Sequence, residues 1–141
     1  MSALLMISTA GSEKEARKIA RGLVEDKIAA CVNVITQITS FFFWNGKLCG
    51  EKEAMLFIKT DKRRIKELIS KIKAMHSYNV PEIIFFEVDG GEKSYLQWIK
   101  AMSLEKDKKN NRKGASGIRR KATPLFGNLL KVPKKLLTKE K

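Results

Sequence analysis

The sequence predicts an α+β fold in which one four-stranded sheet is covered by helices on a single face. Two observations lead to this class. Short β-rich runs alternate with two amphipathic helical repeats, and two long β-rich runs meet at an Asn-Gly pair, Asn45-Gly46. The 141 residues suffice for one domain with a core of its own. We therefore expect the element order β-α-β-β-α-β-α within residues 1–103.

The first strand and the first helix are predicted at residues 3–9 and 12–27. The apolar run ALLMIST is typical of a buried strand. Ser12 is a suitable N-cap, and Glu15 follows at the spacing of a capping box. Apolar side chains then recur at helical spacing, so one face of this helix packs on the sheet: Ala16, Ile19, Ala20, Leu23 and Val24.

A long hairpin is predicted over residues 29–60, because Asn-Gly suits a type I′ turn with positive φ at both central positions. About 15 residues on each side of the turn exceed the usual strand length of ~5–6. A plain two-residue turn would pair Val34 with Phe57 and put the apolar faces out of phase. We therefore expect a β-bulge or a bend in the hairpin.

Three further elements follow the hairpin. Asp61 is the predicted cap of a second helix, whose apolar residues keep helical spacing up to residue 75. A strand is expected at 82–88, and Ser94 is the predicted cap of a third helix over 95–102. This order is the split-βαβ, or ferredoxin-like, arrangement.

Two main helices cover only one face of such a sheet. On the other face we place four apolar side chains among Glu53 and Lys59. Monomers rarely expose large apolar patches, so this open face and the overlong hairpin predict a homo-oligomer. The four apolar residues are Ile35, Met55, Phe57 and Phe85.

Charge divides the chain into a balanced domain and a basic tail. Residues 1–103 carry 16 Lys and Arg against 12 Asp and Glu, whereas residues 104–141 carry 13 against 3. We expect the tail to be a disordered, solubilising extension. Its Leu and Phe residues between lysines leave three partners open: an anionic membrane, nucleic acid or a protein.

The sequence contains no signature of a common enzyme class. It has no GxxxxGK[ST], GxGxxG or GxSxG pattern, and its single histidine excludes an HExxH site. We therefore expect a protein that is not an enzyme. Residues 1–9 are too short for a signal peptide, and two cysteines without such a signal indicate a cytoplasmic protein with free thiols.

Soft metal ligands are few. Cys31, Cys49 and His76 are the candidates, and a Cys/His site would suit copper or zinc. Hairpin pairing places Cys49 opposite Phe42, roughly 36 Å along the strand from Cys31 at ~3.3 Å per residue. The two thiols therefore cannot share an ion within one chain. The alternative is that each cysteine is a small buried hydrophobe and that His76 only ends a helix.

Several polar and aromatic residues allow two interpretations. Glu51 and Glu53 are either ligands for a hard cation or part of a solvated strand face. His76 and Glu82 can meet in a pocket between subunits. Trp44 either lines a pocket or anchors the hairpin turn, and the aromatic run at 41–44 indicates an oligomer contact.

Five segments of the sequence form a recognisable set: AACVN (29–33), QITSFFFWNGK (37–47), EAMLFIKT (53–60), HSYNVPEI (76–83) and SYLQWI (94–99). Together they resemble the CutA divalent-cation tolerance family. The resemblance implies a compact trimer of ferredoxin-like subunits, similar in shape to PII signalling proteins, with hairpins that pair between neighbours. It also implies tolerance of copper and other divalent metals, and it places proposed metal ligands at Cys31 and His76. The chain departs from the family at Ser77, where proline is usual.

Two functional hypotheses result. In the first, a cytoplasmic homotrimer binds a divalent metal, Cu(II), at sites shared between subunits, with Cys31, His76 and Glu82 as ligands. In the second, the chain is a PII-like regulatory module or scaffold, and metal binding is incidental. A small ligand would then occupy a pocket lined by Lys59, Tyr78 and Trp44.

Overall fold

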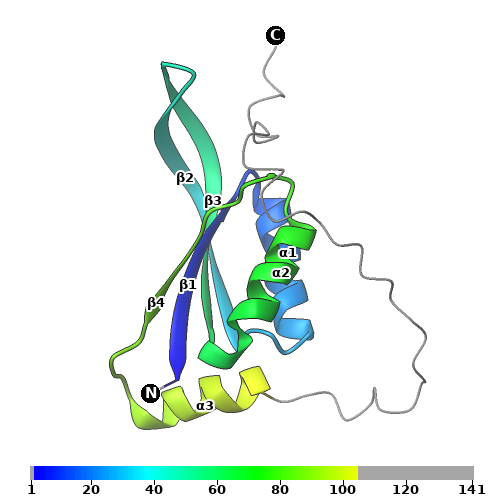
Figure 1. The fold of residues 1–141 in the computed structure, drawn as a ribbon, viewed down its shortest axis with the longest axis vertical. Coiled ribbons are helices and arrows are strands. Elements are labelled where there is room, and N and C mark those ends of the chain that lie inside the picture. The colour runs from blue at the N-terminus through cyan, green and yellow to red at the C-terminus, as the bar shows by residue number, and fades with distance from the viewer. Residues whose placement is uncertain (1, 105–141) are drawn as a thin grey trace, which may run out of the picture.

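A computed structural model describes residues 2–104 of the chain (Figure 1). The elements follow the predicted order, and the basic segment 105–141 lies outside the described residues. No helix among the described residues is long and apolar enough to span a membrane. The elements are β1 (Ala3–Ala10), α1 (Glu13–Glu25), β2 (Cys31–Trp44), β3 (Lys47–Asp61), a 3-10 turn (Lys62–Arg64), α2 (Ile65–Met75), β4 (Ile83–Glu87) and α3 (Lys93–Leu104).

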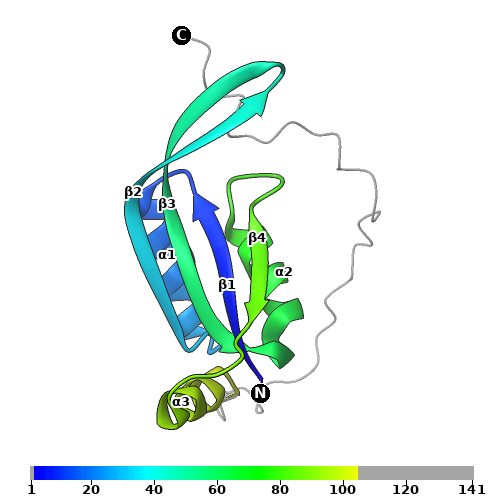
Figure 2. The same ribbon diagram turned by 90° about the vertical axis from the view of Figure 1, so that its left-hand side faces the viewer.

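The four strands form one antiparallel sheet in the order β2-β3-β1-β4. Helices α1 and α2 lie side by side on one face, and α3 lies at the end of the sheet where β1 begins (Figures 1 and 2). This helix packs against β3 and β1. The arrangement is the predicted ferredoxin-like fold, and the sheet face opposite α1 and α2 stays open except at the end that α3 covers.

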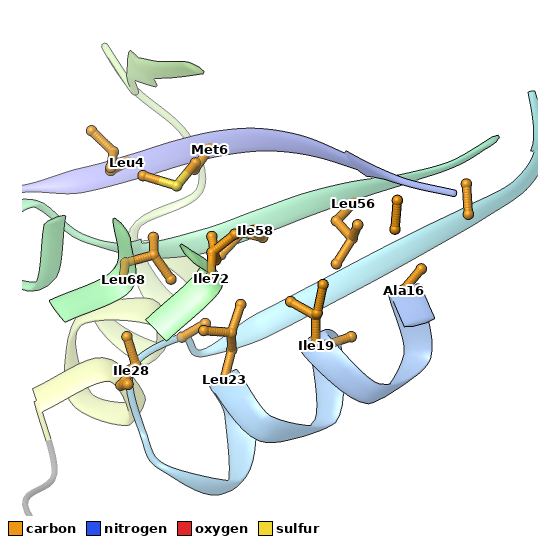
Figure 3. Packing of buried hydrophobic residues seen from close by; sticks show 14 residues of the cluster. Leu4, Met6, Ala16, Ile19, Leu23, Ile28, Leu56, Ile58, Leu68 and Ile72 are labelled. Atoms are coloured by element: carbon orange, nitrogen blue, oxygen red, sulfur yellow. The ribbon is translucent and has the colours of Figure 1, made fainter. Parts of the chain in front are cut away.

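The hydrophobic core fills the space between the sheet and the two helices (Figure 3). Both helices contribute fully buried aliphatic side chains that meet those of β1 and β3. Burying one such side chain stabilises the fold by about 1.5–3 kcal/mol, so this layer fixes the positions of the strands that carry the candidate site. The main contributors are Ile19 and Leu23 of α1, Leu68 and Ile72 of α2, and Met6, Leu56 and Ile58 of the sheet.

A β-bulge corrects the register of the hairpin, as predicted. Val34 pairs with Leu56 rather than with Phe57. Between the pair formed by Ile35 and the pair formed by Ile38, two residues of β2 oppose one residue of β3. Gln37 in this interval has a φ of 58°, in the left-handed region. The extra residue brings the apolar sides of β2 and β3 into phase.

Beyond the bulge, the hairpin extends past the rest of the sheet. Pairing of β2 with β3 continues to Trp44, whereas β1 ends at Ala10 (Figure 1). We call this projecting part, residues 38–53, the arm. Its turn has positive φ at Asn45 (48°) and Gly46 (73°), as a type I′ turn requires. Phe41 and Phe43 on the arm are 73% and 74% exposed, so these two aromatic side chains have little cover from the described residues.

Asp61 ends β3 and caps the 3-10 turn that leads into α2. Its fully buried carboxylate accepts hydrogen bonds from the backbone N–H of Arg63 and from the Arg63 guanidinium, both at 2.9 Å. Burial alone would raise the pKa of Asp61, but these hydrogen bonds and one from Ser2 lower it from 3.8 to about 2. Asp61 is therefore a cap, as predicted, but it caps the 3-10 turn that precedes α2 and not the α-helix itself.

The structure corrects three details of the prediction. Phe85 pairs with core residue Met6 and therefore lies on the helix-covered side, because directly paired residues share a sheet face. Ile84 and Phe86 occupy the open face instead. Helix α3 begins at Lys93, and its first free N–H groups are capped by the Glu92 carboxylate rather than by Ser94. Helix α1 ends two residues early, at Glu25.

Candidate functional site

His76 fixes the turn between α2 and β4. Its side chain is fully buried, and its Nδ1 accepts a hydrogen bond of 3.0 Å from the backbone N–H of Tyr78. An Nδ1 that accepts carries no proton, so the ring proton lies on Nε2, which donates to the carbonyl oxygen of Thr9 at 2.7 Å. Both ring nitrogens therefore form hydrogen bonds within the chain, and these bonds hold the turn against the end of β1.

Tyr78 continues this network toward the hairpin. Its hydroxyl donates to Glu53 at 3.0 Å, and its ring lies 4.6 Å from that of His76. Burial, the hydrogen bond to Glu53 and the charges of Glu53, Glu15 and Glu51 all raise the pKa of Tyr78. The phenol thus remains protonated and available as a donor to the carboxylate.

Gly11 makes room for the tyrosine. A Cβ at this position would lie 2.8 Å from the Tyr78 hydroxyl oxygen, which is closer than real Cβ contacts allow. The strand-to-helix turn between β1 and α1 therefore needs glycine where Tyr78 reaches the buried Glu53. The sequence predicts that Glu51 and Glu53 share a strand face, either solvated or cation-binding. Glu53 is only 6% exposed, so it does not belong to a solvated face.

Glu15 joins α1 to the same turn. Its carboxylate accepts hydrogen bonds from the backbone N–H of Ser77 at 2.7 Å and from the Ser77 hydroxyl at 2.9 Å. Ser12 caps α1 through the N–H of Glu15, but the predicted capping box is only half formed because the glutamate turns to Ser77. Proline at position 77 could make neither bond, so this connection depends on the serine.

Cys31 lies at the opposite end of the sheet. It begins β2 and pairs with Lys59, whose other neighbour across the sheet is Leu5. The Lys59 ammonium lies 5.8 Å from the ring centroid of Tyr95, and that ring stacks on Trp98 at 5.6 Å. The half-buried thiol is free and faces a cationic and aromatic surface.

One chain does not bring the predicted metal ligands together. Cys31 lies level with Leu5 on β1, whereas His76 is bonded at Thr9 and Glu82 directly precedes β4. Four residues of β1 separate the two levels by roughly 13 Å, and β2 lies two strands of ~4.8 Å from β1. Within residues 2–104, no three His, Cys, Asp or Glu side chains lie close enough to hold a metal ion. The set Cys31, His76 and Glu82 stays a prediction.

The predicted ligand-pocket residues are also spread over the chain. Trp44 pairs with Lys47 at the tip of the arm, whereas Lys59 pairs with Cys31 at the far end of β3. Tyr78 is bonded to Glu53 between these two levels. Such a pocket would need residues of more than one chain, and it remains a prediction.

Sequence reasoning missed the structural part played by Glu15 and Gly11. Glu15 stood at a capping-box position, so its side chain was assigned to its own helix. A helical pattern reports which face is apolar, but it does not report which carboxylate reaches a loop 62 residues later. A glycine directly before the N-cap was the one available signal of a close approach.

Residues 4–102 match the family model described as CutA1 divalent ion tolerance protein. The chain belongs to this family. The match covers every described strand and most of α3, and it agrees with the resemblance seen in the five sequence segments. The family description names tolerance of divalent ions and no reaction.

Curated members of the CutA1 family are 33% to 44% identical to this chain over the aligned residues. The Thermus thermophilus divalent-cation tolerance protein CutA is 38% identical over 96 residues, which cover 68% of this chain and 93% of that protein. The Xenopus laevis CutA homolog is 44% identical over 91 residues, covering 64% and 60%. This chain thus spans less than two thirds of the Xenopus protein's length.

Solved structures of the family share the fold. The crystal structure of CutA1 from Oryza sativa matches 74% of this chain and 96% of its own, with a TM-score of 0.72 and 32% identity. The agreement extends over nearly the whole rice chain. The fold of this chain is therefore that of the CutA1 structure.

Proposed function

We propose that this chain acts in divalent-cation tolerance as a cytoplasmic homotrimer, without enzymatic activity, that binds Cu(II) at sites completed by a neighbouring subunit. Family membership supports the link to divalent ions. The observation that carries the shared site is the separation of Cys31 from His76 and Glu82 at two levels of one sheet. A second chain would supply the metal ligand that lies too far away within the first chain.

Assembly through the arm and β4 is supported by two unpaired strand edges. The arm projects beyond β1, so its β3 side has no strand beside it among residues 2–104. Strand β4 is an edge of the sheet and exposes apolar side chains on both faces: Ile84, Phe85 and Phe86. If each arm pairs with the sheet of the next subunit, head-to-tail, the subunits form a closed ring. A ring of three copies is the proposed trimer.

The donor atoms differ in how readily they can bind a metal. Cys31 is a free thiol, and Glu82 is exposed with no hydrogen bond among the described residues. His76 must give up the bond to Tyr78 or the bond to Thr9 before either nitrogen can coordinate. Metal binding through His76 would therefore loosen the turn after α2, whereas binding through Cys31 and Glu82 would leave it intact.

Copper titration of the full-length protein tests the proposal. Cys31→Ser should weaken Cu(II) binding at least tenfold, and Cys49→Ser is the matched control that should bind like the parent. Glu82→Gln should weaken binding as well, with Asp89→Asn as its exposed acidic control. Equal affinity of Cys31→Ser, Glu82→Gln and the parent would contradict these ligands. Light scattering should give three times the 16.0 kDa mass of one chain.

A second candidate function rests on Lys59. Its ammonium lies over the Tyr95 ring, beside the exposed Trp98 ring, and this combination suits a small anion with a flat ring system. A PII-like regulatory role would use such a ligand. Thermal-shift assays with nucleotides should then show stabilisation that Lys59→Gln abolishes and Lys52→Gln retains. A panel of nucleotides without any shift would exclude this function.

A further inference from the structure

A cavity lies between the beginning of β1 and helix α3, and none of its lining residues belongs to the proposed metal site. Its volume is about 410 Å³, within the range of small-molecule sites. Ala3, Gly91 and Leu96 form its apolar wall, and the side chains of Lys93, Gln97 and Lys100 also line it.

The polar groups share one stripe of α3. Leu96 and Gln97 lie three and four residues after Lys93, and Lys100 lies four and three residues after them, so the four side chains leave the helix on the same side. The two lysines are a little over 10 Å apart along the axis at 1.5 Å per residue. They therefore stand at the two ends of the apolar wall.

Neither lysine of this stripe has an acidic partner among the described residues. Helix α3 contains no acidic residue, and neither Lys93 nor Lys100 forms an ion pair with another residue in the range 2–104. Two glutamates that precede α3 are already engaged. Glu87 pairs with Lys62 at 2.7 Å, and both carboxylate oxygens of Glu92 accept backbone N–H groups of α3.

These engagements leave the acids ionised and occupied. The hydrogen bond from Lys62 lowers the pKa of Glu87, and the backbone hydrogen bonds from the N–H groups of Ser94 and Tyr95 lower the pKa of Glu92. Neither carboxylate can swing to a lysine of the stripe without breaking these contacts. An anion that enters the cavity meets two ammonium groups and an apolar wall at the same time.

We propose that this cavity binds a small organic carboxylate with an apolar body. The carboxylate pairs with Lys93 or Lys100, the Gln97 amide donates a further hydrogen bond, and the body covers Ala3 and Leu96. A purely inorganic anion would use the lysines but leave the apolar wall in water. A neutral chain would cover the wall but leave both charges unpaired.

Three matched probes test the proposal on the full-length protein, by calorimetry and by amide chemical shifts of Gly91 and Leu96. Octanoate should bind and shift both amides, whereas 1-octanol and inorganic phosphate should each bind at least tenfold more weakly. Equal binding of octanoate and octanol would overturn the role of the lysines. Equal binding of octanoate and phosphate would overturn the role of the apolar wall.

Two variants locate the site. Lys93→Gln with Lys100→Gln should weaken octanoate binding about fivefold, as expected for exposed charges, and Lys66→Gln with Lys73→Gln removes the same charge from α2 as a control. Gly91→Leu should abolish binding by filling the cavity, since a Cβ there would meet Leu96 at an ordinary 3.4 Å. Unchanged affinity in Gly91→Leu, with the fold intact by circular dichroism, would refute the site.

Discussion

The hydroxyl of Tyr78 donates a hydrogen bond of 3.0 Å to the buried carboxylate of Glu53 across 25 residues of sequence. The tyrosine belongs to the turn after α2, and the glutamate lies on β3 beside the bulge. This bond therefore joins the base of the arm to the layer of helices. It also gives the buried Glu53 carboxylate one of the hydrogen-bond donors that a buried charge requires.

Removing the Tyr78 hydroxyl should destabilise the protein. In Tyr78→Phe the Glu53 carboxylate loses a donor while it stays buried, which costs about 1–3 kcal/mol. Urea unfolding at a fixed protein concentration measures the change. Tyr95→Phe, which alters an exposed ring, is the control and should change stability little.

A double-mutant cycle with Glu53→Gln separates the bond itself from other effects of the substitutions. The two changes together should cost less than the sum of the single changes, since each removes the same bond. Strict additivity would show that the contact between the two side chains does not contribute to stability.

Substitutions at His76 should reveal its two hydrogen bonds separately. Asn can accept from the Tyr78 N–H in place of Nδ1, and Gln can donate to the Thr9 carbonyl in place of Nε2. Each variant keeps one bond, so each should be destabilised by about 1–3 kcal/mol, and His76→Ala by more. Thermal unfolding without metal measures this. A His76→Ala protein as stable as the parent would contradict the structural role.

Acid should weaken the fold through Asp61. Its pKa is lower in the folded protein than in the unfolded chain, so its contribution is complete above about pH 4 and disappears as the pH falls toward 2. The contribution at neutral pH is about 2 kcal/mol. Unfolding free energies of the parent and Asp61→Asn should therefore converge by that amount between pH 5 and pH 2. Parallel curves over this range would exclude Asp61 as the source, and Asp89→Asn should follow the parent.

The left-handed backbone at Gln37 predicts an unusual response to glycine. A non-glycine residue with this φ costs roughly 1–2 kcal/mol, which glycine avoids at a smaller cost in chain entropy. Gln37→Gly should therefore leave stability unchanged or raise it by up to about 1 kcal/mol, whereas Gln37→Val should lower it. Thr39→Gly, at a regularly paired strand position, should be destabilising. Chemical unfolding ranks the three variants, and a Gln37→Gly protein less stable than Thr39→Gly would refute the bulge geometry.

Local patterns were enough to predict most of the fold. The Asn45-Gly46 turn and the mismatch between Val34 and Phe57 together predicted both the hairpin and its bulge. The phase of β4 was wrong because EIIFFEV is apolar at consecutive positions, so alternation could not show which side of Phe85 faces the helices. Only pairing with Met6 decides that question.

The connections around His76 could not be predicted from the sequence. No local pattern shows that both nitrogens of His76 are engaged or that Glu15 reaches Ser77. The bond from His76 to Thr9 and the bonds from Ser77 to Glu15 join residues more than 60 positions apart. They exist because the core brings α1, the end of β1 and the turn after α2 to one place.

The bulge at Gln37 has a consequence for how such an arm can vary. Because the correction of phase is complete at the base, the segment between Ile38 and Glu53 obeys only its own two-residue alternation. Residues can therefore be added to or removed from the arm in opposing pairs without disturbing the packed layer beneath it. The length of the arm sets how far it extends toward a neighbour. This length and the stability of the subunit can therefore change independently during evolution.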